Sequence, residues 1–404
     1  MERAVCLSPS TFVFNSSSEV LFYNSDSGLA VKYLLTDSVK TFISQVLNPG
    51  NMYAVAEREI KKDESSMALL ETLASQFMID YIEFDNVKPF TIPPFLKCHQ
   101  QIWEKKYPGS KTSIPLTDLY VYLNGDCDKN CRDCKKYAFQ MTHCTMHKGE
   151  ISLNVIEQIL NEVLSYKQPV TIHLCGGDIG RYTSLDDLSA LLDKMRIRPQ
   201  VHLSYLNWNP SLCKKLQRCD PKYVFSVEFP LDRNHLHEVS EKCRRSDDIV
   251  EFVVTSEDNI DTVDRMTKMY KLHNVDIIPF YNGGNLDFFK QNVFMGEDDI
   301  VISKPSKQMI FRRMIFNVNN VGKIILRSDG IYYANLNKSS LGNTNQKLVA
   351  IIEKEWEMGE SWRDIRQTEP CSSCIFHYLC PSRSNYEYVL KRNLCFITNN
   401  HEKL

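Results

Sequence analysis

Strand-like and helix-like segments alternate between residues 116 and 290, and this alternation constrains the fold more than any other feature of the sequence. The strand-like segments are rich in β-branched and aromatic residues and cover 116–124, 170–178, 201–207, 223–229, 249–256 and 276–284. The segments between them carry apolar residues at helical spacing. About six such units predict an α/β fold with a parallel sheet, open or closed into a partial (β/α)6 TIM-like barrel. Sites in such folds lie at the carboxyl ends of the strands.

A smaller unit precedes the alternating region. Residues 10–33 predict a β-hairpin or small meander, and residues 37–47 and 64–79 carry apolar residues at helical spacing. The proline-bearing segment 87–95 and the polar segment 110–113 predict a linker. The sequence therefore predicts an α+β unit over the first part of the chain, before the sheet begins.

After residue 300 the pattern changes again. Residues 323–336 predict a hairpin, residues near 348–356 predict a helix, and a cysteine-dense tail follows. We therefore expect three domains, with the bounds 1–112, 113–300 and 301–404.

Composition excludes several classes of function. The formal net charge of the 404 residues is −2 and the isoelectric point is about 6.6, so nothing favours binding to nucleic acid. No stretch approaches the roughly 20 apolar residues of a spanning helix, and the N-terminus has no signal-like apolar region. We expect a cytoplasmic protein, in which fourteen cysteines serve metal binding or catalysis more often than disulfides.

Three cysteines occupy eight positions directly after the first strand of the alternating region, at Cys127, Cys131 and Cys134. Their C-x₃-C-x₂-C spacing suits a 4Fe-4S cluster that leaves one iron open. The same trio also suits a zinc site completed by Cys144, His143 or His147. Spacing alone does not separate these two readings.

A second set of cysteines lies in the C-terminal tail. Cys371, Cys374 and Cys380 form a C-x₂-C-x₅-C run, and Cys395 follows. Four thiolates complete either a closed zinc site or a fully ligated iron–sulfur cluster.

The order of strand, CDKNCRDC, helix, strand and Gly-Gly-Asp resembles the radical SAM superfamily over residues 116–290. The resemblance implies that the first cysteine trio holds a 4Fe-4S cluster whose free iron is chelated by S-adenosylmethionine (SAM). It also implies that Gly176, Gly177 and Asp178 receive the amino group of SAM. By the same resemblance, Ser226 and Glu228 present polar groups to the rest of the cofactor, and Asn259 opens the helix after the fifth strand.

The C-terminal cysteine run resembles the SPASM extension of peptide-modifying radical SAM enzymes. All four ligands of the second auxiliary cluster of that family are present. Ligands of the first auxiliary cluster are missing, because Ala334, Asn335 and Ser384 stand where cysteines are usual. The resemblance therefore implies one auxiliary 4Fe-4S cluster.

The resemblance implies an enzyme that cleaves SAM to a 5'-deoxyadenosyl radical and modifies a ribosomally made precursor peptide by hydrogen abstraction, for example by forming a cross-link. An electron donor such as flavodoxin or ferredoxin is implied, and the N-terminal unit resembles a winged-helix-like element that binds a leader peptide. Two departures from the family pattern, Asp133 in place of an aromatic residue and Asp178 in place of Glu, keep a second hypothesis open. This is a catalytically degenerate scaffold that presents the peptide to a partner enzyme, and a zinc-stapled regulatory protein is a third.

Overall fold

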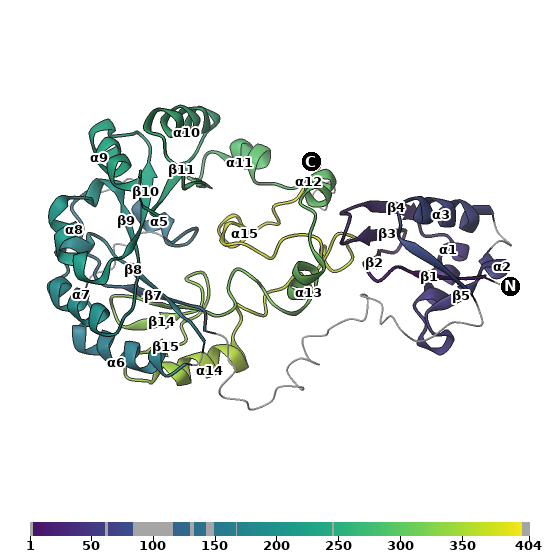
Figure 1. Ribbon diagram of the computed structural model, residues 1–404, viewed down its shortest axis with the longest axis horizontal. Coiled ribbons are helices and arrows are strands. Elements are labelled where there is room, and N and C mark those ends of the chain that lie inside the picture. The colour runs from purple at the N-terminus through teal and green to yellow at the C-terminus, as the bar shows by residue number, and fades with distance from the viewer. Residues whose placement is uncertain are drawn as a thin grey trace.

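The computed structural model describes residues 3–60, 64–83, 116–129, 133–142, 149–166, 168–244 and 246–397, arranged as Figure 1 shows. The expected linker segments at 87–95 and 110–113 lie outside these residues. So does the boundary expected at residue 112, and the three domain bounds therefore stay predictions.

The N-terminal unit contains two small antiparallel sheets and three short α-helices. One sheet has the order β5-β1-β6 and the other is the meander β2-β3-β4. The elements are β1 (Arg3–Leu7), β2 (Thr11–Asn15), β3 (Glu19–Asn24), β4 (Ala30–Leu34), α1 (Asp37–Val46), η1 (Pro49–Asn51), β5 (Ala54–Ala56), α2 (Glu57–Ile60), α3 (Glu64–Ser75) and β6 (Ile79–Glu83). The predicted meander and first helix are confirmed.

The second predicted helix is too long by one turn. Phe77 has a φ of +55°, and the N–H of Met78 donates to the carbonyl oxygen of Leu73 at 2.9 Å. This left-handed residue ends the helix at Ser75, as a typical C-terminal cap does. Gln76 and Phe77, which were expected to continue the helix, form a turn instead, and Ile79 begins strand β6.

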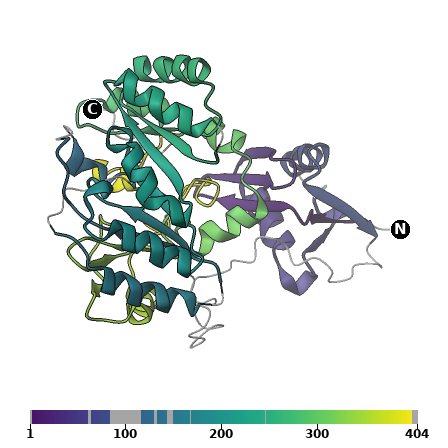
Figure 2. The same cartoon turned by 60° about the vertical axis from the view of Figure 1, so that its left-hand side comes forward.

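A nine-stranded sheet forms the centre of the molecule (Figures 1 and 2). Its order is β12-β11-β10-β9-β8-β7-β13-β14-β15, and strands β7 to β12 are parallel neighbours in chain order. The strands are β7 (Asp118–Tyr122), β8 (Thr171–Cys175), β9 (Gln200–Ser204), β10 (Lys222–Glu228), β11 (Ile249–Val254), β12 (Val275–Pro279), β13 (Lys323–Leu326), β14 (Ile331–Tyr333) and β15 (Gly342–Asn343). The α/β class and the six strands are confirmed, and the partial-barrel curvature stays a prediction.

Helices cover one face of this sheet. They are α6 (Leu153–Leu164), η3 (Ile179–Arg181), α7 (Leu185–Lys194), η4 (Tyr205–Asn207), α8 (Pro210–Leu216), η5 (Gln217–Cys219), α9 (Arg233–Cys243) and α10 (Glu257–Tyr270). Helix α5 (Cys134–Tyr137) lies on the other face, where Tyr137 packs with Val253 and Phe280. Side chains alternate along each strand, so Leu119 and Val121 join the helix-covered core while Tyr120 and Tyr122 point to the other face.

One of two helix starts in this region differs from expectation. Ser152 accepts a hydrogen bond from the Val155 N–H and caps α6 as its sequence indicates. Helix α10, however, opens at Ser256, two residues before Asp258 and three before Asn259. Asn259 sits inside the first turn, where its Oδ1 accepts from the Thr255 N–H and hydroxyl at 3.0 and 3.1 Å. The assignment of Asn259 as the opening residue is therefore wrong, although it does serve the cap.

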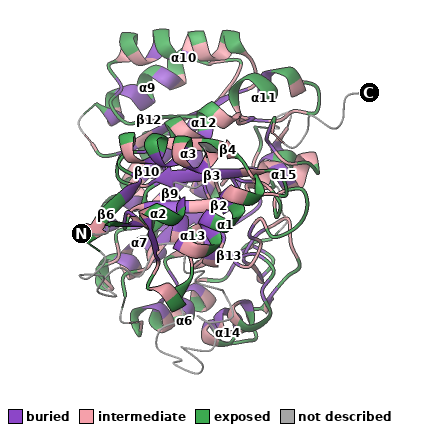
Figure 3. Ribbon diagram, turned by 90° about the vertical axis from the view of Figure 1, so that its right-hand side faces the viewer, coloured by how far each residue is buried: buried purple, intermediate pink, exposed green. Residues whose placement is uncertain are grey.

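The C-terminal part packs against the N-terminal meander. Its helices are α11 (Leu286–Asn292), α12 (Glu297–Ile302), α13 (Lys307–Ile315), α14 (Leu348–Met358) and α15 (Asn385–Leu390). Aromatic side chains of β2 and β3 join residues of α12, α13 and the cysteine-rich tail in one core. Figure 3 shows β3 as an almost fully buried strand. None of the described helices is long and apolar enough to cross a membrane.

Candidate functional site

The expected cluster loop follows β7, at the carboxyl edge of the parallel sheet. Cys127 lies in this loop and is partly exposed, and Cys134 is buried as the first residue of α5. Helix α5 is anchored because the Tyr137 ring packs on Phe280 after β12, with 4.4 Å between ring centroids. Cys131 lies outside the described residues, as do Cys144, His143 and His147, so neither ligand set is tested as a whole.

Two glycines at the end of β8 hold this loop against the sheet. A Cβ on Gly176 would lie 2.7 Å from Asn124 Oδ1, and a Cβ on Gly177 would lie 2.3 Å from the Asp126 carbonyl oxygen. The N–H groups of Gly177 and Asp178 donate to the carbonyl oxygens of Asn124 and Asp126, at 3.1 and 2.6 Å. Binding of the SAM amino group beside these glycines stays a prediction. These contacts show that the glycines make room for the cysteine loop.

The Asp178 carboxylate has partners within the protein. Its Oδ1 accepts from the Gly180 N–H at 3.0 Å, and its Oδ2 lies 3.5 Å from Arg181 Nε. Arg181 also pairs with Asp126 at 3.2 Å and with Asp128, on either side of Cys127. Burial raises the pKa of the Asp178 carboxyl, so its charged form needs such partners. Arg181, which the sequence analysis did not single out, ties the cysteine loop to β8.

A second residue that the sequence analysis missed contacts the first cysteine. Asn207, at the end of η4 after β9, donates from Nδ2 to Cys127 Sγ at 3.9 Å and to the Gly177 carbonyl oxygen at 3.3 Å. N–H groups near sulfur ligands are common around iron–sulfur clusters, where they set the reduction potential. The only signal in the sequence was the position of an amide after the third strand.

Ser226 and Glu228 lie on β10, two strands from the glycines. Ser226 is 1% exposed, and Glu228 Oε2 accepts from the Ser204 hydroxyl at 3.2 Å. Among the described residues, the buried oxygens Ser226 Oγ and Asn207 Oδ1 have no hydrogen-bond partner. Buried polar atoms in proteins are nearly always hydrogen-bonded, so these oxygens fit a polar ligand at this edge of the sheet.

Deeper on the same face lies a chain of polar groups. His173 Nε2 and Asp118 Oδ1 are 2.9 Å apart, and His173 Nδ1 and His202 Nε2 are also 2.9 Å apart. The Tyr120 ring stacks on His173 at 4.0 Å, and Lys323 Nζ lies 4.5 Å from the Tyr120 ring centroid. The hydrogen bond to His173 lowers the pKa of Asp118, and burial lowers that of Lys323. A polar interior therefore continues below the expected cofactor edge.

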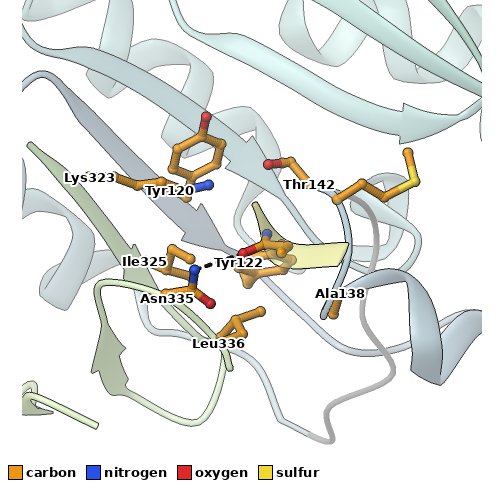
Figure 4. A pocket seen from close by; sticks show the side chains of 10 residues that line it. Tyr120, Tyr122, Ala138, Thr142, Lys323, Ile325, Asn335 and Leu336 are labelled. Atoms are coloured by element: carbon orange, nitrogen blue, oxygen red, sulfur yellow. Dashed lines mark hydrogen bonds between the residues drawn. The ribbon is translucent and has the colours of Figure 1, made fainter. Parts of the chain in front are cut away.

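Asparagines occupy the region where ligands of the first auxiliary cluster are missing. Asn335 Nδ2 donates to Asn320 Oδ1 at 3.0 Å and to Asn385 Oδ1 at 2.7 Å, and Asn385 Nδ2 donates to the Gln140 carbonyl oxygen at 3.4 Å. Figure 4 shows Asn335 between Ile325 and Leu336 in the pocket that Tyr120 and Lys323 also line.

A buried alanine and the residue that precedes a helix occupy the other two positions. Ala334 is 2% exposed, and Ser384 is the N-cap residue of α15. Hydrogen-bonded amides and a helix start thus fill this region, which is the physical reason to expect a single auxiliary cluster. The number of clusters itself stays a prediction.

The four C-terminal cysteines approach one another through a long-range pairing. The Met295 N–H donates to the Leu394 carbonyl oxygen at 3.1 Å, which places Cys395 beside Met295. From there Cys395 is close enough to raise the pKa of Cys371, Cys374 and Cys380 by charge. Burial is the larger cause, and it raises the pKa of Cys374 to about 11 and of Cys380 to about 12. Metal charge would be needed to hold these thiols as thiolates near neutral pH.

Two N–H groups donate to sulfur atoms of this set. The Phe376 N–H lies 3.4 Å from Cys374 Sγ, and Arg366 Nη1 lies 3.8 Å from Cys371 Sγ. Glu387 holds the Arg366 guanidinium with two bonds of 2.9 and 3.0 Å, and these side chains are only 9% and 1% exposed. The Glu387 carboxylate thus fixes the orientation of the Arg366 guanidinium toward Cys371.

The arrangement of the described residues helps to compare zinc with an iron–sulfur cluster. Within that part of the chain, no group of three or more His, Cys, Asp or Glu side chains is gathered closely enough to hold one metal ion. Zinc needs every ligand about 2.0–2.3 Å from a single ion. A 4Fe-4S cube binds each thiolate to a different iron, so its sulfur ligands lie farther apart. The cluster expected at the C-terminal cysteines therefore stays a prediction.

Asp133, where an aromatic residue is usual, has a partner at the surface. Its carboxylate pairs with Lys136 at 2.8 Å, and Lys136 Nζ donates to the Asn282 carbonyl oxygen at 2.9 Å. This pair fastens the start of α5 to the segment after β12.

The resemblance expected from the sequence is confirmed at the level of the fold, which this chain shares with solved structures. Two crystal structures of SuiB from Streptococcus suis share it. One, bound to S-adenosylmethionine, is 13% identical with a TM-score of 0.51, over 96% of this chain and 97% of the other. The second, bound to the precursor peptide SuiA, is 12% identical with a TM-score of 0.52, over 100% of both chains. No protein-family model matches the sequence, and no curated protein matches it.

Proposed function

We propose that this protein is a radical SAM/SPASM enzyme that modifies a ribosomally synthesised peptide by hydrogen abstraction, for example by forming a cross-link. The observation that carries the proposal is the edge formed by β7, β8 and β9, where Asn207 joins Cys127 to Gly177. Its support is the fold shared with a SuiB structure that contains SAM.

In this proposal each part of the edge has a task. Cys127, Cys131 and Cys134 would hold a 4Fe-4S cluster, which supplies the electron that cleaves SAM to a 5'-deoxyadenosyl radical. Gly176, Gly177 and Asp178 would bind the amino group of SAM, and Ser226 and Glu228 its other polar groups. Both oxygens of Asp178 have protein partners, the Gly180 N–H and Arg181, but a carboxylate can accept further hydrogen bonds. The protein binds, orients and excludes water, while the cofactor carries the difficult chemistry.

The C-terminal cysteines would hold the single auxiliary 4Fe-4S cluster. Cys371, Cys374, Cys380 and Cys395 supply four thiolates, so every iron of that cluster has a protein ligand and the cluster is suited to carrying an electron. The Arg366 guanidinium beside Cys371 favours the reduced, more negative state of such a cluster. A flavodoxin or ferredoxin is the expected external donor, and a reducing cytoplasm suits this chemistry.

The peptide substrate is the finer part of the proposal. A SuiB structure contains the precursor peptide SuiA, and it shares its fold with the whole length of this chain. Region 1–112 would bind a leader, 113–300 would perform the radical chemistry and 301–404 would hold the auxiliary cluster. The small sheets of the N-terminal unit offer edge strands for a leader to extend.

A degenerate scaffold that binds the peptide for a partner enzyme is the second candidate. The observation that favours it is Asp178, whose carboxylate already has the Gly180 N–H and Arg181 as partners. A scaffold of this kind keeps its clusters and its peptide affinity but forms no 5'-deoxyadenosine.

The test uses two cysteine variants. Wild-type protein and Cys213→Ala, which changes a partly exposed thiol on α8, should both cleave SAM after reduction with dithionite. Cys127→Ala should form no 5'-deoxyadenosine yet retain about four irons at the C-terminal site. Wild-type levels of SAM cleavage by Cys127→Ala would contradict the assignment of the first cluster. Loss of all iron from this variant would contradict the expectation that the two cysteine sets bind iron independently.

A further inference from the structure

A groove separates the N-terminal meander from the cysteine-rich tail, and it lies away from the sheet edge described above. Its volume is about 250 Å³. The β2–β3 turn contributes Ser16 and Glu19 to one wall, and Glu297 at the start of α12 lies beside them. Figure 1 shows α12 and α13 next to the meander, where these segments meet.

The floor of the groove is apolar and belongs to the cysteine-rich tail. Ile375 and Phe376 are only 4% and 2% exposed, and Ile397 is partly exposed. Cys374 lines the same groove. A chain bound there would touch a residue of the auxiliary cysteine set without entering the sheet.

The rim is acidic and already binds a lysine. Lys32 Nζ lies 3.1 Å from Glu297 Oε1 and 3.3 Å from Glu19 Oε1. Asp298 and Asp299 are exposed on the same first turn of α12. Glu19 and Glu297 against this one ammonium leave a net negative rim, and Lys32 shows that a lysine head group fits between them.

An extended peptide with a cationic side chain next to an apolar one matches this pattern. Successive side chains of an extended chain point to opposite sides and rise by roughly 3.3 Å per residue, so one side chain can reach the floor while a neighbour reaches the rim. We propose that the groove binds a lysine- or arginine-bearing segment of the peptide substrate. That the bound segment belongs to a peptide substrate rests on the proposed function. That it carries a cationic side chain beside an apolar one rests on the groove alone.

Fluorescence anisotropy with the full-length protein tests the chemistry. The probes are fluorescein-labelled octapeptides that alternate leucine with lysine or leucine with glutamine. The leucine–lysine probe should bind more tightly, and adding salt should weaken its binding. Equal affinity for both probes would overturn the proposal.

Three variants locate the binding. The double variant Glu19→Gln, Glu297→Gln should weaken the leucine–lysine probe about tenfold, as expected for two exposed ion pairs. Lys32→Gln removes the competing ammonium and should tighten binding about threefold, an opposite sign that misfolding does not produce. The matched control Asp186→Asn, Asp261→Asn, which changes exposed acids on α7 and α10, should leave the affinity unchanged. Unchanged affinity in the Glu19, Glu297 variant, or weaker binding to Lys32→Gln, would refute the assignment.

The assay also separates this inference from the proposed function. It needs no SAM, so a protein that binds the probe in the groove but forms no 5'-deoxyadenosine contradicts only the enzymatic proposal. A protein that forms 5'-deoxyadenosine but shows no charge-dependent binding contradicts only the groove. Competition of flavodoxin or ferredoxin with the probe would overturn the inference in favour of a surface for the electron donor.

Discussion

Replacing Gly177 with alanine should displace the loop that carries Cys127. The new Cβ would lie 2.3 Å from the Asp126 carbonyl oxygen, and real Cβ contacts essentially never fall below 3.0 Å, so the loop must move by at least 0.7 Å. Overpacking of this kind costs about 1–3 kcal/mol, and weakening of the two backbone hydrogen bonds at Gly177 and Asp178 adds about 1 kcal/mol each. We expect Gly177→Ala to lower the free energy of unfolding by about 3–5 kcal/mol.

The assay pairs urea denaturation with iron analysis after anaerobic reconstitution. Gly284→Ala is the control, because its Cβ would meet nothing closer than Asn282 Oδ1 at 3.6 Å. Gly177→Ala should also lose iron from the first cluster, while the control keeps both its stability and its iron. A Gly177→Ala protein with wild-type stability and iron content would refute the conclusion that the Cys127 loop can lie this close to the sheet only because residue 177 is glycine.

Two further predictions concern buried charges in the C-terminal part. Glu387→Ala leaves the Arg366 cation buried without its carboxylate partner. We therefore expect the free energy of unfolding to fall by about 3–5 kcal/mol and the auxiliary site to lose iron. Denaturation and iron analysis measure these effects, and wild-type values in both would contradict the prediction. Burial raises the pKa of the Glu355 carboxyl from 4.5 to about 7. Between pH 4.5 and pH 7 the folded protein therefore keeps a proton that the unfolded chain releases. The free energy of unfolding falls as the pH rises through this range. Glu355→Gln should therefore raise the free energy of unfolding by roughly 1–3 kcal/mol at pH 8 and change it little at pH 4.5; an equal effect at both pH values would exclude this carboxyl as the cause.

Local patterns were sufficient to predict the order of elements. Strand β8 and helix α6 follow from alternating or helical spacing and from Ser152, which acts within its own turn. The misplaced ends have equally local causes that composition does not reveal. Phe77 adopts a left-handed conformation that glycine or asparagine usually takes, and Ser256 rather than Asn259 starts α10.

Contacts between distant segments could not be predicted in the same way. Asn207 reaches Cys127 across 80 positions, and Arg366 meets Glu387 only because the tail folds back on itself. The sequence indicated that Gly177 needs space, but it could not show that the neighbour is the Asp126 carbonyl oxygen. Motif spacing predicts which residues carry chemistry, whereas the groups that position them depend on tertiary structure.

The most direct test of the central claim, that this fold holds two iron–sulfur clusters and cleaves SAM, is one anaerobic sample. Iron, acid-labile sulfide and zinc are counted, SAM and dithionite are added, and 5'-deoxyadenosine is measured. We expect about eight irons per chain and formation of 5'-deoxyadenosine. About four irons without 5'-deoxyadenosine would favour the scaffold, and zinc without iron would contradict the assignment of both cysteine sets.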